Sequence, residues 1–390
     1  MKIKSLQQKK DWQGKKVLLR VNFDIPQKNG KISGDYRLLA ALPTIKFLVE
    51  KKARLIIISH WGRPKGVDKS LSTRALAAYL QKLLKQKVKH IPDIIGDKAQ
   101  KATKALCDGE IIFLENVRFE EAEKKNDKKF AKKLASLADV YVNEAFSVCH
   151  RQQASVSAIT EYLPAFAGLQ LEDEVKHLQK ILKPIKPLVV VMGGSKIETK
   201  IPLIKQLYKP ASHILLGGGL ASTFLKKIGV EIGRSLYDAK NNKHLNQFFV
   251  GKKIVSKIIL PIDVIVKTVK GRSQHRYLEN VKKSDYILDI GPETIFLFST
   301  YIKKAQTIVW NGPLGKFEEA PFKHGTLAIA SIIASRSTGK AFGLVGGGET
   351  VAALKMTKMD SYVDWVSTAG GAMLSYLGGE KMPGLKNIIY

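Results

Sequence analysis

The sequence predicts an α/β protein built from two doubly wound, Rossmann-like domains with parallel sheets, joined by a hinge helix. Three observations lead to this fold class. Short apolar stretches alternate with helical patterns from one end of the chain to the other. Many of these stretches end in polar or glycine-rich clusters, at the place where doubly wound sheets bind their ligands. Finally, 390 residues are long for a single hydrophobic core.

The first half contains the predicted strands of one sheet. They span 15–23, 54–59, 110–114 and 139–142, with helical patterns over 35–50 and 72–85 and in the charged segment after 119. Behind the strands come Arg37, then His60 and Arg63, then Arg118 and Arg151. Guanidinium groups bind carboxylates and phosphates through paired hydrogen bonds. The first half is therefore predicted to bind a small polyanion.

A helical stretch over 169–182, followed by Pro184 and Pro187, is predicted to connect the two domains. The α/β pattern then repeats, with predicted strands over 188–192, 213–216, 258–266 and 307–310 and a further strand–glycine–helix pattern from 365 onward. Glycines follow most of these strands, and Lys196 and Lys200 would share one face of a helical segment. Glycine clusters can form turns without any ligand, but several of them with lysines and a carboxylate favour a nucleotide site.

The stretch from 340 to 354 gives this prediction its strongest support. An apolar run enters the glycines 346–348, then Glu349, Thr350 and a series of helix-forming residues. The glycines let the backbone approach a ligand closely, and the helix start would direct unpaired N–H groups at a phosphate. Glu349 at that position suits a cation bound to phosphate. Neither the P-loop pattern nor G-x-G-x-x-G occurs at these turns.

Composition indicates a cytoplasmic globular protein. Hydrophobic residues make up 45% of the chain, and no apolar run is long enough for a membrane span. The first ten residues lack the apolar core of a signal peptide. The cysteines, Cys107 and Cys149, match no metal-ligand spacing and are typical of a reducing compartment.

The net charge is high, because 65 Lys and Arg face 34 Asp and Glu, giving +31. Such an excess suggests either nucleic acid or strongly anionic small molecules as partners. The lysines are scattered, however, and no zinc-finger spacing, RNP-type motif or basic heptad region accompanies them. We expect a solvated basic surface and no dedicated nucleic-acid site.

Taken together, these residues make the chain resemble the phosphoglycerate kinase family over essentially its whole length. The matching segments are 20–26 (RVNFDIP), 42–45 (LPTI), 59–64 (SHWGRP), 115–119 (ENVRF), 141–143 (YVN), 150–151 (HR), 193–196 (GGSK), 289–292 (DIGP), 310–313 (WNGP), 317–318 (FE), 346–348 (GGG) and 367–368 (ST). Their order and spacing make the resemblance specific.

The resemblance implies a glycolytic kinase that transfers a phosphoryl group reversibly between 1,3-bisphosphoglycerate and ADP, with Mg²⁺, by hinge closure and direct in-line transfer. It implies a triose-binding domain over 1–168, a hinge over 169–187, a nucleotide-binding domain over 188–364 and a segment over 365–390 that returns to the first domain. The family is usually monomeric, and its partners are 3-phosphoglycerate, 1,3-bisphosphoglycerate, ADP and ATP. No membrane partner is expected.

The resemblance also implies the roles of individual residues. The triose would be bound by Asn22, Phe23, Asp24, Arg37, His60, Trp61, Gly62, Arg63, Arg118 and Arg151. The nucleotide would be bound by Gly194, Ser195, Lys196, Lys200, Gly218, Gly219, Asn311, Pro313, Glu318, Gly347, Gly348, Glu349 and Thr350, with Glu318 on the ribose and Glu349 on the metal. Catalysis would depend on Arg37, Lys200, Gly348 and Gly371, because phosphoryl transfer needs alignment and charge neutralisation.

The chain also departs from the family pattern. Asn22 and Asp24 exchange the usual Asp and Asn, which in an extended segment share one face. Glu349 replaces the usual Asp beside the metal, and Gln153 replaces a histidine. Further departures are Glu144 for Asp, Ser147 for Gly, Lys316 for an apolar residue and Ala369 for Gly.

Three interpretations follow. The first is an active phosphoglycerate kinase. The second is a divergent relative that binds the same ligands with weak or altered activity, as the departures suggest. The third is a basic nucleic-acid-binding protein on the same fold, which only the charge supports.

Overall fold

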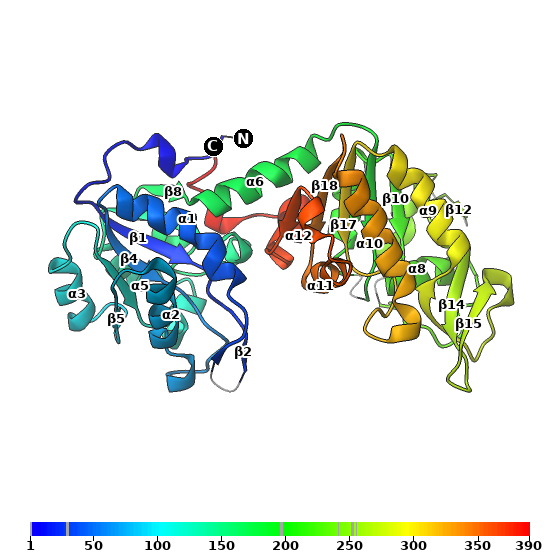
Figure 1. Cartoon of the computed structure of the whole chain (residues 1–390), viewed down its shortest axis with the longest axis horizontal. Helices are drawn as coiled ribbons and strands as arrows, with labels where there is room; N and C mark the ends of the chain where they lie inside the picture. The colour runs from blue at the N-terminus through cyan, green and yellow to red at the C-terminus, as the bar shows by residue number, and fades with distance from the viewer. Residues whose placement is uncertain (1, 29–30, 196–197, 241, 251–252, 255) are drawn as a thin grey trace. The chain divides into compact units, whose positions relative to one another are not determined.

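The structure is a computed structural model that describes residues 2–28, 31–195, 198–240, 242–250, 253–254 and 256–390. The chain forms two compact units, Met1–Lys176 with Lys381–Tyr390, and His177–Glu380. Each unit contains a six-stranded parallel sheet with helices packed around it, as Figure 1 shows. The predicted fold class, two doubly wound parallel-sheet domains, is confirmed.

The sheet of the first unit has the strand order β5-β6-β4-β1-β7-β8. Its strands are β1 (Lys16–Val21), β4 (Arg54–Ile58), β5 (Val88–Ile91), β6 (Ile111–Leu114), β7 (Val140–Glu144) and β8 (Ala165–Ala167), and all pairings are parallel. The apolar runs predicted as strands became β1, β4, β6 and β7, which are buried along nearly all of their length. The sequence analysis did not predict β5 and β8.

Helices α1 (Tyr36–Glu50), α2 (Arg74–Leu84), α3 (Asp97–Lys104), α4 (Glu121–Lys124) and α5 (Lys128–Ala135) connect these strands, and β2 (Gln27–Lys28) and β3 (Lys31–Ile32) form a small hairpin. In α1, Leu38, Ile45 and Leu48 recur at helical spacing and are fully buried. They pack into one core with Val17 and Leu19 of β1. This apolar contact holds α1, and with it Arg37 in its first turn, against the centre of the sheet.

The sheet of the second unit has the order β13-β10-β9-β17-β18-β19, also parallel. Its strands are β9 (Leu188–Met192), β10 (His213–Leu216), β13 (Ile258–Ile259), β17 (Thr307–Asn311), β18 (Phe342–Gly346) and β19 (Trp365–Ser367). Its helices are α7 (Ile201–Tyr208), α8 (Gly218–Lys227), α9 (Pro292–Lys304), α10 (His324–Ser337), α11 (Gly348–Met356) and α12 (Gly371–Leu377). A two-stranded ribbon of β11 (Phe249–Val250) and β12 (Lys253–Ile254) completes the unit, together with the antiparallel sheet described next.

One predicted strand was wrong in its extent. The stretch 258–266 is divided between β13, at the edge of the parallel sheet, and β14 (Asp263–Lys267). Pro261 lies between them and has no N–H to donate to a strand ladder, which explains the break. β14 pairs instead with β15 (Ser273–Tyr277) and β16 (Tyr286–Ile290) in an antiparallel sheet of the order β15-β14-β16.

Helix α6 (Leu169–Leu182) is the predicted connector, and the division between the two units falls within it. On the side of the second unit, the His177 ring stacks on Trp365, with ring centroids 4.1 Å apart. Within the part of the chain that the structure describes, no helix has both the length and the apolar character needed to cross a membrane.

The segment predicted to return to the first domain begins later than expected. Residues 365–380 belong to the second unit, because β19 pairs with β18 and completes its sheet. Only Lys381–Tyr390 joins the first unit, where Tyr390 exchanges backbone hydrogen bonds with Lys2 and Asn387 donates to Thr160.

Candidate functional site

In the first unit, the strands followed by the predicted polyanion-binding residues are neighbours in the sheet. The order β6-β4-β1-β7 brings together the carboxyl ends that precede Arg118, His60, Asp24 and Arg151. Parallel strands place these ends at one edge of the sheet, so residues that are far apart in the sequence lie close together in space.

Asn22 and Asp24 are both held by hydrogen bonds to neighbouring strand ends. The Asn22 Nδ2 donates to Ser147 Oγ, and its Oδ1 accepts from Asp24 N at 3.3 Å. The Asp24 Oδ1 accepts from Gly62 N at 2.9 Å, and its Oδ2 lies 3.6 Å from His60 Nε2. Burial opposes the charged form of Asp24, but the His60, Gly62 and Arg118 interactions outweigh it and lower the pKa of this carboxyl. Asp24 is therefore an anion at neutral pH.

Arginines surround this carboxylate. Arg37 donates to the backbone oxygen of Asp24, and its Nε is buried without a hydrogen-bond partner among the described residues. Arg118 donates to Gly62 O at 2.6 Å. Burial, together with the charges of Arg20 and Arg151, lowers the pKa of Arg118 to about 10. The site thus holds several cations close together, an arrangement that a bound polyanion would stabilise.

The remaining predicted triose-binding residues differ in their exposure and in which of their groups could contact a ligand. Arg63 is exposed. Phe23 and Trp61 are almost completely buried, and the Trp61 Nε1 donates to Ile25 O at 2.8 Å. The side chains of Phe23 and Trp61 therefore stabilise the core beneath the site, and only their backbone groups are placed to meet a ligand.

His60, one of the predicted triose-binding residues, is not a basic group in this structure. Its side chain is 2% exposed, and burial lowers its pKa to about 3 against the opposing interaction with Asp24. At neutral pH the imidazole is uncharged and acts as a hydrogen-bonding group rather than a cation.

In the second unit, the glycine-rich turns also follow neighbouring strands. Strands β10, β9, β17, β18 and β19 are adjacent, and each is followed by one of the predicted glycine clusters. A Cβ on Gly193 would lie 2.0 Å from Pro313 O, so the turns after β9 and β17 approach too closely for any side chain there. Gly347 has φ of +99°, a conformation that favours glycine, immediately before α11 begins at Gly348.

These turns enclose two adjoining cavities of about 410 Å³ and about 300 Å³. Both are lined by Gly194, Ser195 and Glu349. The larger is also lined by Gly218, Gly219, Ser222, Leu236, Ile287, Leu288, Pro313, Gly315, Lys316 and Glu318. The smaller is also lined by Thr199, Lys200, Asn311, Gly312, Gly347, Gly348, Thr350, Gly370, Gly371 and Leu374. The predicted nucleotide residues therefore lie together, except Lys196, which is outside the described residues.

Lys200 and Asn311 give the smaller cavity its polar character. Lys200 is 8% exposed, and among the described residues the hydrogen-bond partner of its Nζ is Asn311 O, at the long distance of 3.4 Å. Burial lowers the pKa of Lys200 to about 8, although Glu349 attracts its charge. Within the described residues the buried Oδ1 of Asn311 has no hydrogen-bond partner. A buried cation with such weak neutralisation suits an anionic ligand.

Glu349 is the residue that fits the expected metal. It is exposed at the start of α11 and lines both cavities. No cluster of three or more His, Cys, Asp or Glu side chains that could hold a metal ion occurs within the described ranges. Mg²⁺ is commonly held by one or two carboxylates, substrate phosphates and water, so a single carboxylate beside a phosphate site is sufficient.

Sequence reasoning missed the apolar wall of the larger cavity. Leu236 follows α8 in an irregular segment, and Ile287 and Leu288 belong to β16. The motif at 289–292 pointed to the end of β16, but isolated apolar residues carry no signal of ligand contact. Their position becomes visible only when the antiparallel sheet is placed beside the turn after β17, where Lys316 N donates to Leu288 O at 2.7 Å.

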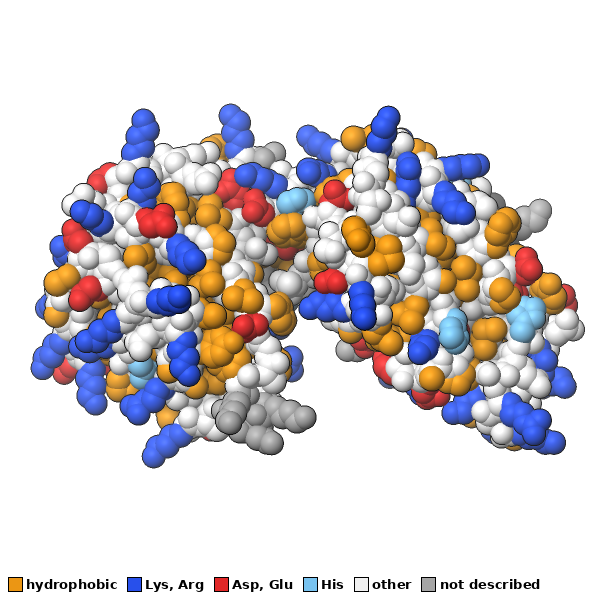
Figure 2. Space-filling model, in the orientation of Figure 1, with side chains coloured by type: hydrophobic (Ala, Val, Ile, Leu, Met, Phe, Trp, Pro, Cys, Tyr) orange, Lys and Arg blue, Asp and Glu red, His pale blue; other side chains and the backbone are white. Residues whose placement is uncertain are grey.

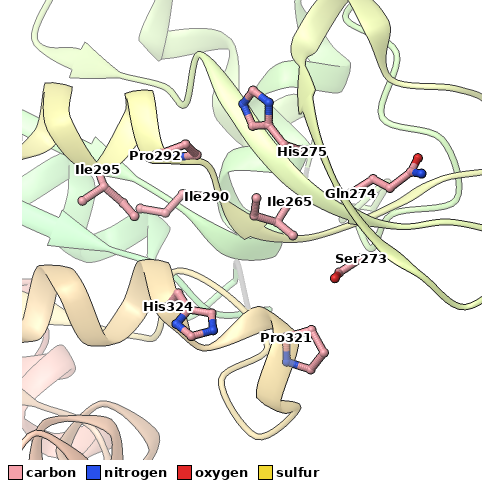
Figure 3. A pocket seen from close by; sticks show the side chains of 9 residues that line it. All are labelled: Ile265, Ser273, Gln274, His275, Ile290, Pro292, Ile295, Pro321 and His324. Carbon is pink, nitrogen blue, oxygen red and sulfur yellow. The ribbon is translucent and has the colours of Figure 1, made fainter.

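A third cavity, of about 340 Å³, contains none of the predicted residues. Figure 3 shows it between the antiparallel sheet and the starts of α9 and α10, with Ile265 and Ile290 near its centre and His324 and Pro321 below them. His275, which also lines it, has its Nε2 2.8 Å from the buried Asp263 carboxylate.

On the face seen in Figure 2, the basic side chains are not concentrated in one region. Figure 2 shows Lys and Arg side chains spread over both units on the face in view, among apolar and acidic ones. On this face they form no continuous stripe of the kind that follows a nucleic-acid backbone.

The chain is similar to known proteins over nearly its whole length. A family profile described as Phosphoglycerate kinase matches residues 7–380. The chain is 41% identical over 385 residues to a phosphoglycerate kinase of Wolbachia pipientis subsp. Culex pipiens (strain wPip), covering 97% of both chains. It is 40% identical over 391 residues to one from Pelotomaculum thermopropionicum, again covering 97% of both. The solved phosphoglycerate kinase of Coxiella burnetii superposes with a TM-score of 0.89 at 38% identity, covering 99% of both chains.

Proposed function

This chain belongs to the phosphoglycerate kinase family and is an enzyme with a glycolytic role, and on that premise we propose the details of its reaction. It transfers a phosphoryl group reversibly between 1,3-bisphosphoglycerate and ADP, giving 3-phosphoglycerate and ATP. The observation that carries the proposal is the pair of sites, an arginine-rich one in the first unit and a glycine-lined one with a buried lysine in the second. Two anionic substrates of different shape require two such sites.

The triose phosphate binds in the first unit. Arg37, Arg118 and Arg151 neutralise its phosphate and carboxylate, and Asp24 accepts a hydrogen bond from a hydroxyl group. The Nε of Arg37, which has no hydrogen-bond partner among the described residues, supports this assignment, because a bound oxyanion would complete its hydrogen bonding.

The nucleotide binds in the second unit. The apolar wall formed by Leu236, Ile287 and Leu288 suits the base, and Glu318 accepts from the ribose. The phosphates lie in the smaller cavity, where the start of α11 offers N–H groups and Lys200 offers charge. When bound, Mg²⁺ would be held by Glu349 and the phosphates, whose negative charge it would neutralise.

Catalysis rests on alignment and charge, with Arg37 and Lys200 on the transferring group and the backbone N–H groups of Gly348 and Gly371 on its oxygens. Since donor and acceptor bind to different units, transfer requires hinge closure, for which α6 and residues 183–187 supply the connection. We propose that the enzyme works in the cytoplasm as a monomer, with these small molecules as its partners and without nucleic acid.

The test is a coupled assay with 3-phosphoglycerate, MgATP and an NADH-linked dehydrogenase, with Arg37→Ala as the control. We expect turnover in the parent and its loss in the variant. Absence of turnover with both ligands still bound in calorimetry would identify the divergent relative that the departures from the family suggest. Absence of both turnover and binding would refute the proposal.

A further inference from the structure

A chain of buried hydrogen bonds lies beneath the triose site. Ser155 donates through its Oγ to Glu123 Oε1 at 2.7 Å and accepts from Arg20 Nε at 2.9 Å. Arg20 also donates to Val21 O, and its Nη2 lies 3.0 Å from His60 Nδ1. Arg20 and Glu123 are both 0% exposed, so neither side chain is in contact with solvent.

The direction of the contact between Arg20 and His60 follows from chemistry. A guanidinium group carries only donors and stays protonated in proteins. The His60 Nδ1 must therefore accept, which leaves the imidazole proton on Nε2. That Nε2–H faces the Asp24 carboxylate, 3.6 Å from its Oδ2.

We infer that Arg20 is a positioning residue that fixes the neutral, Nε2-protonated tautomer of His60, so that an N–H donor points at Asp24 and at the ligand beside it. The identity of the ligand in this inference rests on the proposed function, whereas the tautomer of His60 does not depend on it. Arg20 does not reach the ligand from its buried position and acts through the imidazole.

The charged groups around His60 favour the same state. The positive charges of Arg20 and Arg118 oppose a second proton on the His60 ring, whereas the Asp24 carboxylate would favour it. Burial decides between them, because the ring is 2% exposed and a charged imidazole there would lack water. With the proton on Nδ1 instead, the Nε2 lone pair would face a carboxylate, and the site would repel the oxygens that it has to bind.

The first experiment observes the tautomer of His60 in the parent protein and uses a variant only to assign the signal. Long-range ¹H–¹⁵N spectra of histidine-labelled protein distinguish the two neutral tautomers, and His60→Gln identifies the His60 signal among the 8 histidines. We expect the Nε2-protonated neutral form, unchanged from about pH 5.5 to about pH 8.5. A proton on Nδ1, or titration near the ordinary histidine value, overturns the inference.

The second experiment separates positioning from a structural effect. Because loss of Arg20 alone would remove a positive charge that favours the ionised form of the buried Glu123, the variant is Arg20→Gln with Glu123→Gln, and Glu123→Gln alone is the matched control. We expect the control to keep the tautomer and the double variant to lose it. Its KM for 3-phosphoglycerate should rise about tenfold, the usual effect of losing a hydrogen bond to a charged group, with the KM for ATP unchanged.

The outcomes are distinct. A rise in KM with an unchanged His60 spectrum assigns Arg20 a merely structural role and refutes the inference. If the parent shows no turnover, the proposed function fails, while the spectra still decide the tautomer. If the double variant does not fold, the parent spectrum decides alone.

Discussion

Glu144 provides a prediction whose size follows from its surroundings. It is 6% exposed, and its Oε1 accepts from Thr44 Oγ1 at 2.5 Å and from Gln170 N at 3.1 Å. Its Oε2 accepts from Leu171 N at 3.3 Å, so the carboxyl group caps the first turn of α6. Burial raises its pKa to about 7, although these hydrogen bonds oppose the rise.

A raised folded-state pKa means that the protonated form stabilises the fold. The contribution of Glu144 is fully present below its ordinary pKa of 4.5 and is lost as the pH rises through about 7. The difference between these values corresponds to about 3 kcal/mol in the free energy of unfolding. Glu144→Gln, which has no titrating proton, should lack this dependence.

The assay is urea unfolding of the parent and Glu144→Gln at several values from about pH 5 to about pH 8. Both proteins carry Trp310→Phe and Trp365→Phe, so that fluorescence reports only Trp12 and Trp61 in the first unit. We expect the parent to lose about 2 to 3 kcal/mol relative to the variant across this range, since the remainder of the effect falls below pH 5. A difference between the two proteins that stays constant with pH would show that Glu144 does not titrate there and that the reasoning is wrong.

Three further predictions concern the sites. Lys200→Met should lower kcat by about 100-fold or more, with little change in the KM for 3-phosphoglycerate, because it removes charge from the transferring group; an unchanged kcat in the coupled assay would remove Lys200 from catalysis. Glu349→Gln should raise the Mg²⁺ concentration needed for half-maximal activity, whereas Glu349→Asp should raise turnover if the longer side chain displaces the ion by about an ångström; magnesium titrations of both variants check this. Asn22→Asp with Asp24→Asn should bind 3-phosphoglycerate as the parent does only when Ser147→Gly is added, since Ser147 now accepts from Asn22; calorimetry that finds the same affinity with and without that change would refute the coupling.

The sequence predicted the sheets well, because buried parallel strands are continuous apolar runs, as in β4 and β9. It also predicted which residues follow the strands. It did not predict the network around Arg20, because Glu123 and Ser155 come from distant segments and reach Arg20 only through the strand order. The same limit applies to charge, since the sequence does not show whether His60 is charged, and its burial in the fold is what makes it neutral.

The departures from the family in the first unit are best understood together. Asn22 donates to Ser147, so a hydroxyl group at a position where the family has glycine gives the exchanged amide a partner. Asp24, which carries the exchanged carboxylate, is held by Gly62 N and faces His60. The exchange therefore moves the negative charge by two residues within the segment that follows β1, without leaving either side chain unsatisfied.

Glu144 shows the same compensation, and Gln153 does not. The longer side chain of Glu144 reaches the first turn of α6, and a Cβ on Gly168 would lie 1.9 Å from its Oε2, so the carboxyl group fills the space that glycine leaves. Gln153 is 7% exposed, and its Oε1 has no hydrogen-bond partner in the described part of the chain. Unpaired buried oxygens are costly, so the position of Gln153 is best explained by a ligand or a neighbouring donor that completes its hydrogen bonding. Asn22, Asp24 and Glu144 all have hydrogen-bond partners, so these departures by themselves give no physical reason to expect a loss of ligand binding.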